Sequence, residues 1–434
     1  MESIIFSTLK ELVDKGIEKD LVDSAIHQIE FHRKEITNTP YPFGIKLLLS
    51  FTGAVIHEGD PASYVNIDDD LDRLKKELET KGFLEKKLKQ YLIDNPHRVL
   101  FTLEPDKDLE SRQLNETRKE LKLRLKKMTS KDIDLIKSDA KTLEALQEKE
   151  EDLNVLPTLE LDDVPPEIEI IRPDTISNVD FATGYDKATS GILYFTCPMG
   201  AGTIEPDLFS LVPFFCKAFT NCGTQKNSYE KLARRMDLFT GGVSITPFSG
   251  SYFSKEADAH SFLALQGKAL DRNIERLFDL IAEFVESYTF ADHERLKSLL
   301  LQYQAGLEAS IVSTGHRYAI SLASKQLSQA SHINELWHGI AQYQLIKSLT
   351  EQLLSESNTT HTLDTLAGKL TRIAGSILNK GNLKPALIGG ADAIETAENQ
   401  LISIHDNLPD NGAASFFTPS IPFESDYPFD GWHT

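Results

Sequence analysis

Between Pro105 and Pro157 the chain contains neither glycine nor proline, and charged residues of both signs alternate densely with sparse leucines. Such a segment has nothing to break a helix and too few apolar residues for a core of its own. We therefore predict two antiparallel helices over 106–156, with a cap for the second helix at Thr129-Ser130-Lys131-Asp132. Because the leucine spacing is too irregular for three heptads, a hairpin that tethers two larger blocks is favoured over a coiled-coil dimer.

The block before the hairpin, 1–105, is mostly helical in pattern. Apolar residues at helical spacing predict helices at 4–12, 20–34 and 71–81, and Gly16 separates the first two. An apolar run covers 45–56, and His97–Leu103 predicts a strand that ends before Pro105. We interpret this block as the C-terminal part of an α+β domain.

The block after the hairpin, 157–405, mixes both periodicities. Strands are predicted at 167–171, 192–196, 242–247, 261–266 and 384–388. Helices are predicted at 205–220, 229–238, 272–287, 292–311 and 316–326, with Pro206 at the start of the first and Gly241-Gly242 after the second. Strands followed by stacked helices and a closing strand predict an α+β fold, with a mainly antiparallel sheet and helices packed on one face.

Composition argues against several classes of protein. The hydrophobic share of 40% and the charged share of 26% are typical of a globular chain. A net charge of −20 argues against a nucleic-acid partner, whose phosphates need a basic surface; it suits either basic or unfolded peptides or simply solubility.

Targeting signals are missing from the sequence. No apolar run reaches the roughly 18 residues that cross a bilayer, and the first residues lack the pattern of a signal peptide. Three cysteines are too few for a disulfide framework. We expect a soluble intracellular protein with no membrane partner, in a bacterial cytoplasm or an organelle matrix.

Several phrases resemble the presequence-protease branch of the insulinase (pitrilysin) family of zinc peptidases. In the first block these are Ile26–Phe31, His57–Pro61 and Asp94–Val99, which are similar to the family's second domain. The hairpin resembles the family's connector. In the third block the phrases are Leu211–Cys216, Thr240–Ser244 and Ser313–His316, which are similar to the third domain.

The resemblance covers almost the whole chain in the family's order, and it implies a domain plan. Residues 1–105 would be the C-terminal part of the second peptidase-like domain, and 106–156 the helical hairpin connector. Residues 157–405 would be a third, non-catalytic peptidase-like domain, and 406–434 a linker toward a fourth domain. The chain would then be an internal piece of a larger enzyme.

The family's zinc site is an H-x-x-E-H motif on a helix of the first domain, in which two histidines bind zinc and the glutamate is the general base. This motif does not occur in the sequence. At the equivalent helix of the third domain, Phe214 and Ala218 stand in place of the histidines and Lys217 in place of the glutamate. The resemblance therefore implies zinc in the parent enzyme, but no catalytic residue and no metal ligand in this chain.

Other metal sites are also disfavoured by spacing. His27 and His32 are five residues apart, which places them about 140° apart around a helix. Glu335 and His338 form a single E-x-x-H pair, whereas a di-metal bundle needs two such pairs and further carboxylates.

Two segments remain as candidate peptide-binding sites. Gly241, Gly242, Val243 and Ser244 either expose a strand edge to which a peptide adds, or simply end a helix and begin a strand. His316 either faces the substrate chamber or lies in the first turn of a helix that Ser313–Gly315 separates from the preceding one.

We expect the chain to form the non-catalytic wall of a zinc-dependent oligopeptidase, and to be inactive alone. Its partners would be unfolded peptides and the remaining catalytic and C-terminal domains of the same protein. A stand-alone peptide-binding protein, or the partner subunit of a two-chain peptidase of this family, is the alternative. Exposed apolar surface near Ile4, Ile5 and Leu9, with some self-association, is also expected.

Overall fold

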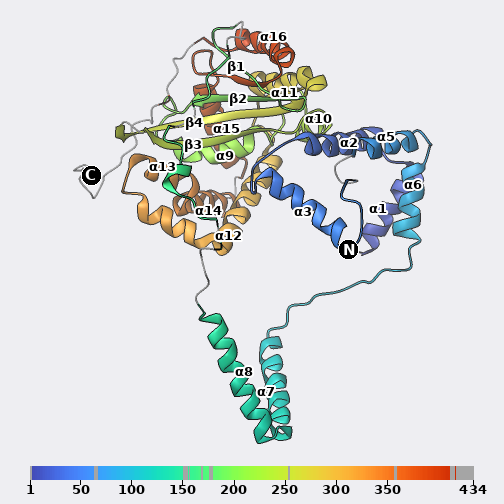
Figure 1. Ribbon diagram of the computed structural model, residues 1–434. Coiled ribbons are helices and arrows are strands. Elements are labelled where there is room, and N and C mark those ends of the chain that lie inside the picture. Colours follow the sequence, from blue (N-terminus) through green and yellow to red (C-terminus); the bar gives the residue numbers. More distant parts are fainter. Residues whose placement is uncertain are drawn as a thin grey trace. The chain divides into compact units, whose positions relative to one another are not determined.

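The computed structural model describes residues 2–62, 67–149, 155, 157–167, 170–174, 179–252, 255–355, 359–410 and 416. The chain forms two compact units (Figure 1). The larger unit joins 1–89 to 172–434, and the smaller unit is 90–171. Among the described residues, no helix is both long enough and apolar enough to span a bilayer.

The larger unit is built on a sheet of five strands in the order β1-β5-β2-β4-β3. The strands are β1 (Thr183–Asp186), β2 (Ile192–Gly200), β3 (Val243–Tyr252), β4 (Lys255–Leu270) and β5 (Ala386–Gly389). Only β1 and β5 are parallel; β5–β2, β2–β4 and β4–β3 are antiparallel. Strand β3 ends the sheet and pairs only with β4 among the described strands.

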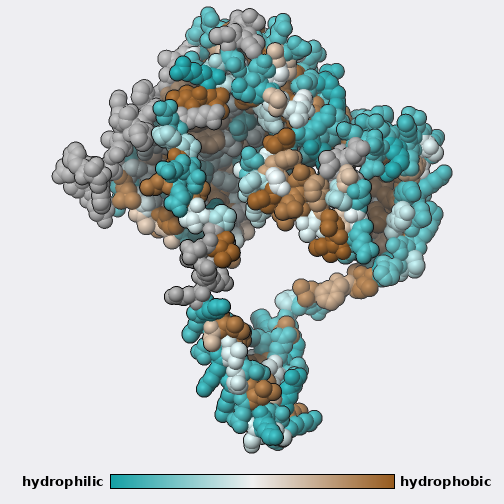
Figure 2. Space-filling model, in the orientation of Figure 1, coloured by the Kyte–Doolittle hydropathy of each residue, from teal (hydrophilic) through white to brown (hydrophobic). Residues whose placement is uncertain are grey.

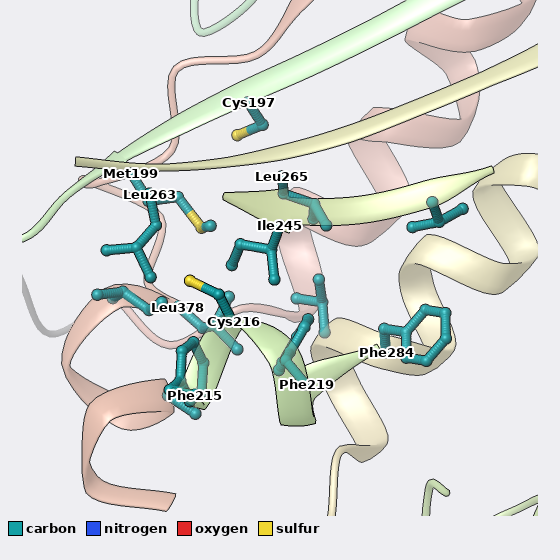
Figure 3. Close-up of a cluster of buried hydrophobic side chains, with 14 of the residues drawn as sticks. Cys197, Met199, Phe215, Cys216, Phe219, Ile245, Leu263, Leu265, Phe284 and Leu378 are labelled. Atoms are coloured by element: carbon teal, nitrogen blue, oxygen red, sulfur yellow. The ribbon is translucent and has the colours of Figure 1, made fainter. Parts of the chain in front are cut away.

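One face of the sheet is buried against helices. Alternate residues of β2, from Leu193 to Met199, are at most 4% exposed and belong to the main core. Figure 3 shows Cys216 and Phe219 of α9 (Val212–Phe219) directed toward Ile245 and Leu265 of the strands. On the same face, α11 (Ile274–Ser287) approaches β4 so closely that a Cβ on Gly267 would lie 2.8 Å from Leu277. The predicted α+β fold, mainly antiparallel with helices on one face, is confirmed.

The remaining helices of this layer are α10 (Tyr229–Phe239), α12 (His293–Ser324), α13 (Gln329–His338), α14 (Ile340–Ser355), α15 (Thr359–Ile377) and α16 (Ala391–Asn407). Asp292 and Ser328 cap α12 and α13 by accepting hydrogen bonds from the backbone N–H of Arg295 and Ser331. The break predicted at 313–316 is a kink inside one helix, since Thr314 has φ −133° and ψ 35° while α12 continues to Ser324.

The first part of the chain is helical. It contains α1 (Glu2–Lys15), α2 (Lys19–Lys34), α3 (Phe43–Ile56), α5 (Ile67–Leu78) and α6 (Phe83–Leu88), which a short π-helix, Lys89–Ile93, follows. Gly16 separates α1 from α2 at φ +88°, as its position predicts. Apolar residues gather on the surface over α3, where Leu48 and Leu49 are 62% and 59% exposed (Figure 2).

The smaller unit is the predicted hairpin, formed by α7 (Leu109–Lys127) and α8 (Ser130–Gln147). The cap of α8 is confirmed: Thr129 accepts from the N–H of Asp132, and the Asp132 carboxylate accepts from the N–H of Thr129. Neither helix buries a residue, because their leucines are spread around both surfaces. The unit also contains a short 3₁₀ turn, Leu161–Asp163.

Three local predictions were wrong. Residues 97–103 form no strand, and Val99 and Leu103 are 90% and 84% exposed, because no described strand pairs with them. Of the strand predicted at 167–171, residues 168–169 lie outside the described part of the chain, and the other three are not extended into a ladder. The helix predicted from Glu205 begins at Val212 instead, after a 3₁₀ turn at Phe209–Leu211, with Pro213 in its first turn.

Candidate functional site

The face of the sheet opposite the helical layer holds an open groove of about 610 Å³. Its floor consists of side chains from alternate strand positions, which point away from the core. Tyr194 of β2 lies between Lys268 of β4 and Ile388 of β5, and Gln266 of β4 lies between Thr196 and Ser244. Hydroxyl, amide and aromatic groups therefore form a largely neutral floor.

Lys268 brings a positive charge to this floor, and that charge is paired. Its Nζ lies 2.5 Å from a carboxylate oxygen of Glu35, the residue that follows α2, and 5.4 Å from the centre of the Phe31 ring. Burial raises the pKa of Tyr194, and the nearby charge of Glu35 adds to that effect. Tyr194 thus stays a neutral hydrogen-bonding phenol at physiological pH. The described residues of the groove can bind polar backbone, but they include no activated nucleophile.

Helix α2 closes one end of the groove. Phe31 is 1% exposed and packs against Ile192, Leu270 and Tyr194. The Gln28 amide donates to the carbonyl oxygens of Asp237 and Thr240, at 2.6 and 2.9 Å. These contacts join a segment near the start of the chain to the sheet and to the C-terminal end of α10.

An ion pair reinforces this docking. Both carboxylate oxygens of Glu30 accept from Arg272, each at 2.8 Å. The Arg272 guanidinium holds the pKa of Glu30 down at about 2. Glu30 is therefore ionised throughout the physiological pH range.

Within the described part of the chain, strand β3 has no partner strand on its outer side, so this edge of the sheet is open. The Lys268 N–H donates to the Gly242 carbonyl, so even-numbered residues of β3 are the ones bonded to β4. The backbone groups of Val243, Ile245 and Pro247 then face away from β4. Proline, which has no N–H, is tolerated at an outward position of this kind.

The four predicted residues at 241–244 come together beside this edge, but they do different things. A Cβ on Gly241 would lie 2.2 Å from the Phe31 ring, so the Phe31 side chain of α2 packs directly against Gly241. Gly242 has φ +117°, which only glycine adopts without strain. Val243 buries its side chain in the core, whereas Ser244 is exposed on the open face. A peptide-binding role for these residues stays a prediction.

The other predicted residue, His316, is exposed on α12 just after the kink and does not line the groove. The structure thus does not bring His316 together with 241–244. Its chamber-facing role also stays a prediction.

The positions that resemble a zinc motif lie on α9, beneath the sheet. Phe214 and Ala218 are both fully buried, and Lys217 is exposed. Neither a phenyl ring nor a methyl group carries a lone pair for a metal, so these residues do not fit zinc. No group of three or more metal-ligating side chains occurs anywhere in the described part of the chain.

The cysteines do not supply a nucleophile. Burial raises the pKa of Cys197 and of Cys222 to about 12, and it raises that of Cys216 as well. All three thiols are buried and remain protonated. Figure 3 shows Cys197 and Cys216 among the apolar side chains of the core.

Sequence reasoning missed Tyr194, Gln266, Lys268 and Glu35. Gln266 and Lys268 are two residues apart at the end of a strand predicted from the sequence, so a continued strand places both on the same face. Nothing in the local sequence pairs Glu35 with Lys268, because that contact depends on where α2 docks.

The chain is similar to known peptidases over most of its length. The profile of the family described as associated with peptidase M16, subfamily C, matches residues 103–349. The mitochondrial presequence protease of Xenopus laevis is 27% identical over 403 residues, which cover 92% of this chain and 38% of that protein. Protein HypA of Clostridium perfringens is 25% identical over 405 residues, which cover 92% of this chain and 41% of that protein.

A solved structure described as a peptidase M16 inactive domain from Pseudomonas fluorescens is also similar, with a TM-score of 0.35 and 16% identity. That match covers 54% of this chain and 49% of the other. The chain spans about two fifths of the length of the two relatives named above.

Fold and site together define an α+β unit in which the described residues leave one face and one edge of the sheet open. The chain belongs to the family associated with peptidase M16, subfamily C, since the match covers more than half of it. The predicted resemblance to presequence proteases is confirmed.

Proposed function

We propose that this chain forms the non-catalytic wall of a chamber in which a zinc-dependent oligopeptidase degrades unfolded peptides. Its role is to hold the substrate, while the zinc and the general base belong to another part of the parent protein. The relatives named presequence proteases support a peptide substrate. Phe214, Lys217 and Ala218 support the absence of zinc chemistry from this domain, because none of them can do the work of a histidine ligand or a carboxylate base.

The open edge of β3 is the observation that carries the proposal. An extended peptide adds to such an edge through main-chain hydrogen bonds, which read no side chains and therefore suit unfolded substrates of varied sequence. Val243 and Ile245 offer both a donor and an acceptor, and Pro247 offers an acceptor only. The neutral floor of the groove beside this edge supplies hydroxyl and amide partners for the rest of the peptide.

The wider assignment belongs to the same proposal. Residues 1–105, 106–156, 157–405 and 406–434 are the end of a second domain, a connector, a third domain and a linker. The partners are the catalytic and C-terminal domains of the same protein. We place the protein in a bacterial cytoplasm or an organelle matrix, in line with relatives named mitochondrial and chloroplastic.

Peptide backbone methylation tests the edge directly. A fluorescent unfolded peptide is compared with two analogues, each N-methylated at every second residue, in the two alternate phases. An N-methyl group removes a donor and adds bulk on one side of an extended strand only. We expect one phase to weaken binding by about tenfold or more, which two lost hydrogen bonds explain, and the other phase to bind like the parent.

Equal affinity for all three peptides would contradict strand addition at β3. On the protein side, Ser244→Arg places a long side chain on the open face beside the edge. We expect it to weaken binding without unfolding the chain, because Ser244 is exposed. Ser111→Arg in the hairpin, also exposed, is the matched control.

A further inference from the structure

A second pocket lies in the helical layer, at the kink of α12. It has a volume of about 380 Å³ and is formed by α12 and α13. This size is at the lower end of the range for small-ligand sites, roughly 300–1,000 Å³. The kink at Thr314 forms part of its wall, and the Thr314 hydroxyl donates to the Ser310 carbonyl at 2.9 Å.

The charge in this pocket is unusual for so acidic a chain. Arg317 lines the pocket, and within the described part of the chain it makes no ion pair or hydrogen bond. None of the described side chains that line the pocket is an aspartate or a glutamate, although the chain has 66 acidic residues and a net charge of −20. A guanidinium without a carboxylate partner is a ready site for an oxyanion, which it binds through two parallel hydrogen bonds.

The rest of the lining contains both polar and apolar side chains. Ser310, Thr314 and Asn334 supply hydroxyl and amide groups, and Tyr303, Leu307 and Trp337 supply apolar surface. Trp337 is held in place by its own N–H, which donates to the Phe209 carbonyl at 2.9 Å. Burial raises the pKa of Tyr303 to about 12 and lowers that of His338, so both side chains are neutral at pH 7.

We propose that this pocket binds the C-terminal carboxylate of a peptide, with Arg317 pairing with the carboxylate and the apolar lining residues contacting the last side chain. The inference rests on the proposed function, because it assumes that peptides are the ligands of this chain. It is a second binding site, which recognises the end of a peptide instead of its backbone. The pocket belongs to the helical layer and the groove to the opposite face of the sheet, so the two sites should act independently.

The test compares one unfolded peptide as its free acid and as its C-terminal amide, each labelled at the N-terminus, by fluorescence anisotropy with the 434-residue chain. We expect the free acid to bind about tenfold or more tightly, since a charge-assisted pair is lost in the amide. In Arg317→Gln the two peptides should bind with equal, weaker affinity, and Arg317→Lys should restore part of the difference. Arg118→Gln, an exposed arginine of α7, should change nothing.

Equal binding of acid and amide to the unaltered chain would overturn the carboxylate proposal. If backbone methylation still weakened binding, the proposed function would stand; if no peptide bound at all, both would fall. Binding of inorganic phosphate is the remaining measurement. Phosphate binding that depends on Arg317, together with equal binding of the free-acid and amide peptides, would identify the pocket as a site for a free oxyanion. The proposal that it binds a peptide carboxylate would then be wrong.

Discussion

The absence of a side chain at Gly241 allows α2 to pack against the sheet. The Phe31 ring occupies the space that a Cβ would take, at 2.2 Å from its nearest ring atom. We expect Gly241→Ala to lower the free energy of unfolding by about 1–3 kcal/mol, the usual cost of overpacking a core contact. Urea unfolding monitored by circular dichroism measures the change.

A double-mutant cycle shows whether that cost comes from Phe31. Phe31→Leu removes the ring atoms nearest to Gly241, so Gly241→Ala should cost less in the Phe31→Leu background than alone. Gly368→Ala is the matched control, because Gly368 lies inside α15 with nothing within 4 Å of a Cβ. It should be neutral or stabilising by up to about 1 kcal/mol. An unchanged stability of Gly241→Ala would show that α2 does not dock there.

At the scale of the element, the docking of α2 should depend on pH through His27. This side chain is 5% exposed, and burial lowers its pKa; the Thr240 carbonyl and Glu30 oppose the shift, while Arg272 adds to it. The unfolded chain therefore takes up a proton that the folded chain resists, so stability falls as pH drops through and below 6.5, the ordinary histidine value. We expect a loss of up to about 1.4 kcal/mol for each pH unit below that value.

Urea midpoints at pH 7.5 and 5.5 measure this slope. His27→Leu should flatten it, whereas His97→Leu, an exposed histidine of the other unit, controls for the loss of a titrating side chain as such. Glu30 affects the stability of the fold over a different pH range. Its pKa is depressed from 4.5 to about 2, so its contribution is present above pH 4.5 and disappears only as pH falls toward 2. If stability still fell with pH in His27→Leu, the pH dependence would come from another group.

The helices and strands also show which features can be predicted from the sequence and which cannot. The strands at 192–196, 242–247 and 261–266 and the cap at Thr129 were predicted correctly, because alternation and capping are local patterns. The strand at 97–103 was wrong, because an apolar extended run becomes a strand only where a partner strand exists. The contact of Phe31 with Gly241 could not be predicted, since it joins two distant segments that carry no shared signal.

At the scale of the whole molecule, apolar surface is exposed at two of the three residues named from the sequence, since Leu9 is half-buried, and it is also exposed elsewhere. Ile4 and Ile5 of α1 are 64% and 50% exposed. The larger exposed area is on α3, whose 14 residues bury only Ala54 (Figure 2). A helix that is apolar on all sides is usually covered by other protein. Self-association of the isolated chain stays a prediction.

The proposed function leads to the last prediction. Substrate holding here would depend on backbone groups of β3, which need no metal. Hydrolysis would depend on two zinc ligands and a general base, which this domain lacks at 214, 218 and 217. We expect the purified 434-residue chain to hold far less than one equivalent of zinc and to leave a quenched unfolded peptide uncleaved. Elemental analysis after dialysis and a fluorescence assay measure the two quantities.

Peptide binding is the positive control for that experiment. A chelator should leave the affinity for the labelled peptide and the midpoint of urea unfolding unchanged, because neither depends on a metal in this domain. One equivalent of zinc with chelator-sensitive cleavage would show that the chain contains a complete active site, and the chamber-wall function would then be wrong. Binding that persists without zinc or cleavage would separate the capture of peptides from their hydrolysis, which is what a wall with an open strand edge and a buried, ligand-free α9 requires.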